Sequence, residues 1–110
     1  MFIQTRKFSL TLDKLISENK LSVNDFIDLE DCLLRNPNEG EIVSGTGGFR
    51  KTRLKSTSKG KRGGFRLYYL DIEEKGKLFF VALYAKNVQE DLSQEEKKSL
   101  RSLSEALRKE

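Results

Sequence analysis

The sequence of 110 residues contains no His and no Trp, and only one Cys, one Pro and one Met. Without His, the chain cannot form a Ser-His-Asp triad, and no imidazole is available as a general base. A single thiol excludes a disulfide framework and a zinc site built from cysteines. We expect Cys32 to be a small apolar residue of a helix in a reducing compartment. Any enzymatic chemistry therefore falls to Lys, Arg, Tyr, Ser, Asp or Glu.

Long apolar segments are also lacking. The longest uninterrupted apolar run is Leu78–Tyr84, whereas a membrane-spanning helix needs about 20 apolar residues. The first residues reach Arg6 and Lys7 without an apolar core after the charges, which differs from a signal peptide. We therefore expect a cytoplasmic protein with no membrane partner, folded as one domain over residues 1–110.

Charge is distributed unevenly along the chain. The net charge is +4, but the stretch from Phe49 to Arg66 contains eight basic residues and no acidic one. The rest of the chain carries 13 basic and 17 acidic residues, a net charge of −4. Six of the eight Gly lie in or beside the basic stretch, where they let backbone amides approach phosphates. A run of charged residues often does no more than form a solvent-exposed surface. Here the combination of basic residues and glycines favours a nucleic acid as partner.

The apolar pattern predicts an α+β fold. Residues 2–8 alternate as a short first strand, and Ser9 can cap a short helix. A capping box opens a second helix at Ser22, which ends in the breaker cluster of residues 36–40. Three antiparallel strands are predicted at residues 49–54, 65–72 and 78–84. A capping box at Ser93 begins a last helix, and we expect the N-terminal helices and this C-terminal helix to cover one side of the small sheet.

Basic side chains fall on neighbouring strands of this predicted sheet, with Tyr residues between them. Neighbouring strands lie about 5 Å apart, so side chains on one face can converge on a single phosphate. Convergent cations without carboxylates suit the stabilisation of a pentavalent phosphate, and Tyr rings can stack on bases. Residues 45–48, Gly-Thr-Gly-Gly, lack the spacing of a phosphate-binding P-loop and predict a turn that enters a strand. The residues of this constellation are Arg50, Lys51, Arg53, Arg66, Lys86, Tyr68, Tyr69 and Tyr84.

Three motifs carry a resemblance to a known family. They are Gly-Thr-Gly-Gly-Phe-Arg-Lys at residues 45–51, Gly-Lys-Arg-Gly-Gly-Phe-Arg-Leu-Tyr-Tyr at 60–69, and Tyr-Ala-Lys-Asn at 84–87 with Asp-Leu-Ser at 91–93. Together they resemble the HigB branch of the RelE/ParE toxin superfamily. The resemblance implies a RelE-like fold and a type II toxin that cleaves mRNA on the ribosome, as an endoribonuclease without metal or other cofactor. It also implies a cognate antitoxin, which we expect to be a helix-turn-helix protein from the adjacent gene, and contact with operator DNA only through the toxin–antitoxin complex.

The resemblance also implies roles for individual residues. In the family, the ribose 2′-hydroxyl of the substrate attacks the adjacent phosphate, and Lys and Arg residues activate it and stabilise charge. The matching catalytic positions are Lys51, Arg53, Arg66 and Lys86. The expected RNA-binding residues are Arg50, Lys55, Lys59, Lys61, Arg62, Tyr68 and Tyr84. Ribosome-dependent relatives carry a catalytic Tyr near the C-terminus, but no Tyr follows Tyr84 here, which leaves the general acid and base unassigned.

Two other functions fit the same pattern. Some members of the superfamily poison DNA gyrase and do not cut RNA, and a basic domain can bind RNA or DNA without any chemistry. Basic residues on adjacent strands favour chemistry, whereas a cluster confined to residues 56–64 would favour plain binding.

Overall fold

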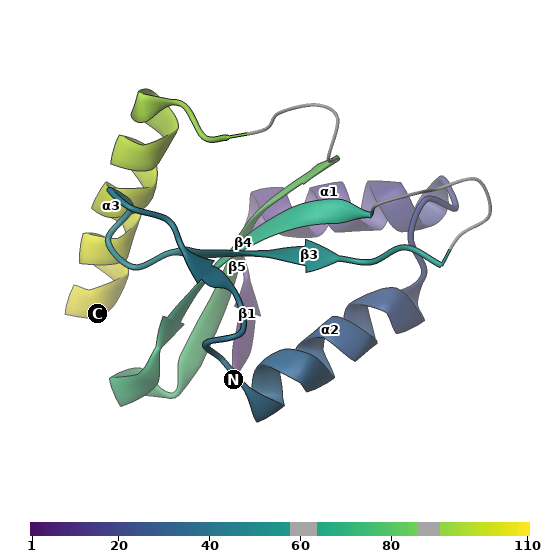
Figure 1. Cartoon of the computed structure of the whole chain (residues 1–110), viewed down its shortest axis with the longest axis horizontal. Helices are drawn as coiled ribbons and strands as arrows, with labels where there is room; N and C mark the ends of the chain where they lie inside the picture. Colours follow the sequence, from purple (N-terminus) through teal and green to yellow (C-terminus); the bar gives the residue numbers. More distant parts are fainter. Residues whose placement is uncertain (58–63, 86–90) are drawn as a thin grey trace.

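The computed structural model spans the chain and describes residues 1–57, 64–85 and 91–110 (Figure 1). A short 3-10 turn, Glu73–Lys75, separates the last two strands. The elements in chain order are β1 (Phe2–Gln4), α1 (Arg6–Ser17), α2 (Val23–Arg35), β2 (Glu41–Ile42), β3 (Arg50–Leu54), β4 (Phe65–Ile72), β5 (Lys77–Ala85) and α3 (Gln94–Lys109). The predicted α+β class, with a helix at the C-terminus, is confirmed.

The five strands form one sheet in the order β1-β5-β4-β3-β2. Strands β3, β4 and β5 pair antiparallel with one another, as predicted, and β2, which was not predicted, pairs antiparallel with β3. Strand β1, however, pairs with β5 in the parallel direction, so the sheet is mixed. No hairpin sets the direction of β1, because α1 and α2 separate it in the chain from β2 at the opposite edge of the sheet.

The sheet carries helices on both faces, and not on one side as the sequence pattern predicted. Helices α1 and α2 cover one face, called here the α1/α2 face, where the rings of Phe8, Phe26 and Phe80 pack together. Helix α3 covers part of the opposite face, the α3 face, where Leu100 packs in a second cluster with Leu70. Figure 1 shows α3 set apart from α1 and α2. The central strands are buried on both sides, which explains their continuous apolar sequence.

A β-bulge in β5 sets which side chains reach the α3 face. Tyr68 pairs with Ala82 but Tyr69 pairs with Phe80, so Val81 is the additional residue. As a result, Val81 and Ala82 both pack on the α3 face, and the alternation of side chains changes phase after them. Without the bulge, Tyr84 would point to the same face as Phe80.

The N-terminal elements differ from the prediction in their bounds. Strand β1 ends at Gln4, and the N-cap of α1 is Thr5, whose side chain accepts a hydrogen bond from the Phe8 amide at 3.2 Å. Ser9 therefore lies inside the helix, and Leu10 is 58% exposed and contributes little to the core. Phe8 belongs to the buried face of this helix with Leu12, a spacing of four residues that the alternating pattern of residues 2–8 concealed.

None of the helices in the described residues has the length and the apolar composition that crossing a bilayer requires.

Candidate nucleic-acid interface

The pairing of β3, β4 and β5 places two rows of side chains on the α3 face. Lys51 lies opposite Tyr68, and in the next row Arg53 lies opposite Arg66, which in turn lies opposite Tyr84. Side chains that are directly opposite in an antiparallel pair share a face of the sheet. The structure therefore brings together on one face five residues that the sequence analysis assigned to catalysis or RNA binding.

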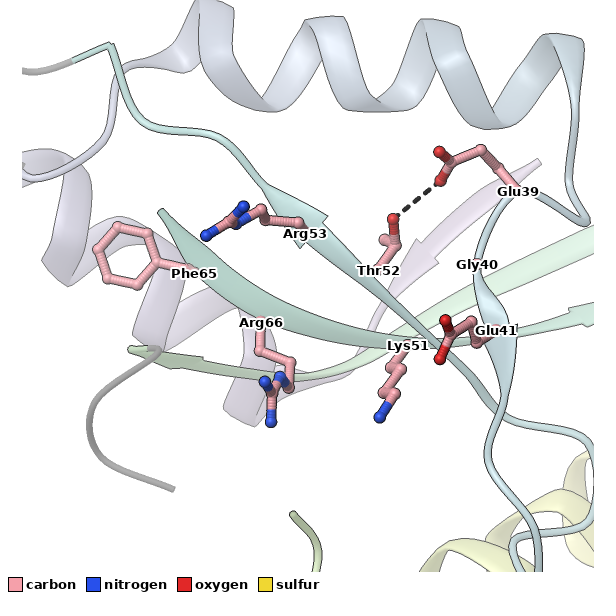
Figure 2. Close-up of a pocket in the computed structure, with 8 residues that line it drawn as sticks. All are labelled: Glu39, Gly40, Glu41, Lys51, Thr52, Arg53, Phe65 and Arg66. Atoms are coloured by element: carbon pink, nitrogen blue, oxygen red, sulfur yellow. Dashed lines mark hydrogen bonds between the residues drawn. The ribbon is translucent and has the colours of Figure 1, made fainter. Parts of the chain in front are cut away.

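Lys51 and Arg66 line a common hollow of about 420 Å³. Figure 2 shows both side chains extending in the same direction from neighbouring strands, whereas the Arg53 side chain lies further along β3, beside Phe65. Arg53 also borders a second hollow, toward α2. The first hollow is lined by Glu39, Gly40, Glu41, Lys51, Thr52, Arg53, Phe65 and Arg66. Its cationic part is thus centred on Lys51 and Arg66.

The Arg66 guanidinium has unused hydrogen-bonding capacity. Its Nη1 atom is buried and has no hydrogen-bond partner among the described residues. A buried donor without a partner costs free energy, more so when the group is charged. An arginine can present two parallel N–H groups to a phosphate, which would satisfy this donor. The arrangement therefore suits an anionic ligand.

Four carboxylates that the sequence analysis did not single out lie at the site: Glu39 and Glu41 line the hollow, and Asp91 and Glu96 contact its neighbouring residues. Asp91 Oδ1 lies 4.0 Å from Lys51 Nζ, and Glu96 Oε2 accepts a hydrogen bond from the Tyr84 hydroxyl at 3.2 Å. Glu96 is at the same time the N3 residue of the capping box of α3. The sequence signal that could have found Asp91 and Glu96 is their position just before and at the start of α3, the helix that covers part of the α3 face. A polyanion would have to compete with Asp91 for Lys51, but a pair this exposed is worth at most about 1 kcal/mol.

The two Tyr residues of the α3 face differ in what they can offer to RNA. Tyr68 is only 2% exposed, so its ring has no free surface on which a base could stack, which corrects its assignment to RNA binding. It packs instead edge-on against Tyr84, with the ring centroids 6.1 Å apart. Burial and the neighbouring Glu96 carboxylate raise the pKa of Tyr84, and its hydroxyl stays protonated at neutral pH. Tyr84 is half-buried and remains available to a ligand.

Some of the predicted RNA-binding residues lie elsewhere. Arg50 is on the α1/α2 face, where its guanidinium donates hydrogen bonds to the carbonyl oxygens of Asn38 and Gly40 at 3.3 and 2.6 Å. Lys55 follows β3 and lines the hollow beside α2, which Asp28 also lines. The structure thus separates these two cations from the Lys51–Arg66 pair. The remaining predicted residues Lys59, Lys61, Arg62 and Lys86 lie outside the described residues.

The Gly-Thr-Gly-Gly motif forms the turn into β3 that the sequence predicted. The Thr46 hydroxyl donates to the Val43 carbonyl at 2.7 Å and accepts from the Phe49 amide at 3.2 Å. Gly47 has a φ of +75°, which favours glycine, and its carbonyl accepts a hydrogen bond from Ser104 Oγ of α3 at 2.7 Å. The motif therefore forms a turn that fixes α3 to the sheet.

The described residues contain no group of three or more Cys, Asp and Glu side chains arranged to hold a metal ion. The chemistry that these residues can supply is that of Lys, Arg and Tyr: attraction of a polyanion, bidentate binding of a phosphate, and hydrogen bonding to its oxygens.

Comparison with known families agrees with the fold and with the basic face. Residues 33–110, more than half of the chain, match the family described as the RelE toxin of the RelE / RelB toxin-antitoxin system. The match includes β2 to β5 and α3, and hence all the described residues that line the α3 face around Lys51 and Arg66. It does not distinguish the HigB branch. Toxins of this family are generally endoribonucleases that inhibit translation, and each has an antitoxin as partner. The chain belongs to the RelE toxin family.

Proposed function

We propose that this toxin inhibits translation as an mRNA endonuclease that cuts its substrate on the ribosome. The observation that carries the proposal is that Lys51 and Arg66 line one hollow beside β3, and that the buried Arg66 Nη1 lacks a partner among the described residues. In the reaction, the ribose 2′-oxygen attacks the adjacent phosphorus while the bond from phosphorus to O5′ breaks. The 2′-hydroxyl loses a proton, O5′ gains one, and the products carry a 2′,3′-cyclic phosphate and a 5′-hydroxyl.

The cations have distinct roles in this proposal. Arg66 and Arg53 stabilise the additional negative charge on the phosphate through their guanidinium groups. Lys51, and Lys86 beyond the described residues, carry protons to or from the reacting oxygens. Tyr84 borders the same row of side chains and supplies a ring surface and a protonated hydroxyl to the RNA.

The test is single-turnover cleavage of ribosome-bound mRNA at saturating toxin. We expect Arg66→Ala and Lys51→Ala to slow cleavage about 100- to 1,000-fold each, the usual effect of removing one donor to a transition state. The matched control is Lys98→Ala, an exposed cation of α3 that does not line the hollow. Wild-type rates for both hollow variants would exclude the hollow as the active site.

A second measurement separates this function from the two alternatives. If the wild-type protein leaves ribosome-bound mRNA intact but blocks DNA supercoiling by gyrase, the toxin is a gyrase poison. If it does neither and only binds nucleic acid, the domain is a plain binding module.

A further inference from the structure

Carboxylates as well as cations line the hollow beside β3. Glu41 and Lys51 lie directly opposite each other on β2 and β3, so their side chains share the α3 face. Figure 2 shows the Lys51 side chain between those of Arg66 and Glu41. A carboxylate repels the phosphates of RNA, so Glu41 weakens the attraction of the hollow for a polyanion. Its place in the hollow therefore suits a contact other than phosphate binding.

The Glu41 carboxylate is available to a ligand. It is exposed, and among the residues that the structure describes it accepts no hydrogen bond and forms no ion pair. The Nζ atom of Lys51, its cross-strand neighbour, lies instead 4.0 Å from Asp91. The other carboxylate of the hollow is already engaged, because Glu39 Oε2 accepts a hydrogen bond from the Thr52 hydroxyl at 2.9 Å. Glu41 is thus the better placed of the two acceptors.

The loop before Glu41 is held in place by hydrogen bonds from two neighbouring strands. The buried Tyr69 hydroxyl donates to the Pro37 carbonyl at 2.7 Å and accepts from the Gly40 amide at 3.0 Å. The Arg50 guanidinium donates to the Gly40 carbonyl at 2.6 Å. Glu41 therefore begins β2 in a defined position. Such support is typical of a residue that must keep one geometry in a binding site.

We propose that Glu41 recognises a guanine base of the RNA while Lys51 and Arg66 bind the phosphate of the same nucleotide. The proposal rests on the ribonuclease function already proposed and adds a base preference to it. A carboxylate only accepts hydrogen bonds, and guanine presents two adjacent donors, N1–H and N2–H, on the edge that proteins read in single-stranded RNA. Adenine and cytosine present an amino group beside an acceptor nitrogen, and uracil presents one N–H between two carbonyl oxygens. Each of these three bases would therefore place an acceptor against the carboxylate.

The dimensions of the hollow fit one nucleotide. Strand β3 lies between β2 and β4, so Glu41 and Arg66 belong to strands about 10 Å apart. This separation is comparable with the span from the phosphate of a nucleotide to the outer edge of its base. The volume of about 420 Å³ is within the range of small-ligand pockets, about 300 to 1,000 Å³. The two ends of the hollow differ in charge, which favours one orientation, with the phosphate toward Arg66 and the base toward Glu41.

The first test measures base preference without any cleavage. The 3′-monophosphates of guanosine, adenosine, cytidine and uridine contain no bond that the toxin could cut, and NMR titration measures their binding to the purified protein. We expect the guanosine nucleotide to bind about tenfold more tightly than the other three, the usual discrimination of a bidentate contact with a base. Equal affinities of the four nucleotides, or binding by none of them, would overturn the proposal.

The substitution Glu41→Gln tests the residue itself. The amide keeps the size of the side chain but presents one acceptor and one donor, a pattern that complements adenine. We expect it to lower the ratio of guanosine to adenosine affinity about tenfold. The matched control is Glu18→Gln, which removes the same charge from an exposed residue outside the hollow. A ratio that stays at the wild-type value in Glu41→Gln, or that changes equally in Glu18→Gln, would overturn the assignment.

The second test carries the preference to the ribosome. Cleavage rates are compared for ribosome-bound mRNAs that differ only in having guanine or adenine beside the cut. We expect the wild type and Glu18→Gln to cut the guanine substrate about tenfold faster, and Glu41→Gln to lose this preference. The same preference in all three proteins would overturn the role of Glu41. A protein that binds the guanosine nucleotide selectively but leaves mRNA intact would refute the ribonuclease function alone, so the failures of the two proposals can be told apart.

Discussion

At the scale of single residues, Asp25 links a helix start to the basic part of the chain. Its carboxylate accepts hydrogen bonds from the Ser22 amide at 3.0 Å and from the Thr57 hydroxyl and amide at 2.7 and 3.3 Å. The first pair closes the capping box of α2, and the second holds the chain just after β3 against this helix. Burial raises the pKa of Asp25, but these hydrogen bonds outweigh burial and keep the pKa below its ordinary value of 3.8.

We expect Asp25→Asn to lower the free energy of unfolding by about 1–2 kcal/mol at pH 7, because hydrogen bonds to a charged acceptor are lost. A carboxylate with a depressed pKa stabilises the fold above the ordinary pKa of 3.8, and this contribution is lost as the pH falls through the folded-state value. The difference between wild type and variant should therefore vanish in acid. Urea unfolding at pH 7 and below pH 3.8 measures it, with Asp28→Asn, an exposed neighbour on the same helix, as the control. A pH-independent difference would show that the charge of Asp25 is not involved.

At the scale of elements, the sequence predicted the order of the main strands and helices and the turn into β3. The capping boxes at Ser22 and Ser93 were informative because their hydrogen bonds are local. What escaped prediction depends on contacts between distant segments. The parallel pairing of β1 and the helices on both faces follow from packing, and the bulge at Val81 is hidden in an apolar run that has no alternation to interrupt.

At the candidate site too, features set by local sequence could be predicted, and features set by contacts between distant segments could not. Lys51, Arg53 and Arg66 could be predicted because the basic residues and the strands are both visible in the sequence, and pairing places them on one face. The separation of Arg50 from these residues could not be predicted, because its hydrogen-bond partners are the carbonyls of a loop ten or more residues away. Glu96 was hidden for a similar reason, since its contact with Tyr84 requires α3 to fold back over the sheet.

The turn into β3 should be sensitive to a side chain at Gly47. A Cβ there would lie 3.0 Å from Ser104 of α3, in addition to the strain of a positive φ. Gly76 has a φ of +62° but no atom within 4 Å of the corresponding position, which makes it the matched control. We expect Gly47→Ala to destabilise the protein by about 2–4 kcal/mol and Gly76→Ala by about 1–2 kcal/mol, the cost of the left-handed conformation alone. Equal losses in urea unfolding would contradict the proposed packing of the turn against α3.

At the scale of the whole molecule, the Lys51–Arg66 pair and a group of carboxylates of α2 lie on opposite sides of the sheet. The Lys51–Arg66 pair is on the α3 face, while exposed carboxylates of α2, among them Asp28 and Asp31, lie over the α1/α2 face. Such an arrangement orients the molecule as it approaches a polyanion, with the α3 face forward.

This separation of charge makes a prediction about salt. Each phosphate that a cation neutralises releases counterions, so the logarithm of the ribosome-binding constant should fall linearly with the logarithm of the salt concentration, by about 0.7 per contact with single-stranded RNA. We expect the double variant Lys51→Gln/Arg66→Gln to bind more weakly and to reduce the slope by about 1.4, for two lost contacts. Asp31→Asn, which neutralises a charge of α2, should leave the slope unchanged because that carboxylate is directed away from the RNA. Ribosome binding titrated at several potassium chloride concentrations measures these slopes, and an unaltered slope for the double variant would mean that other cations make the phosphate contacts.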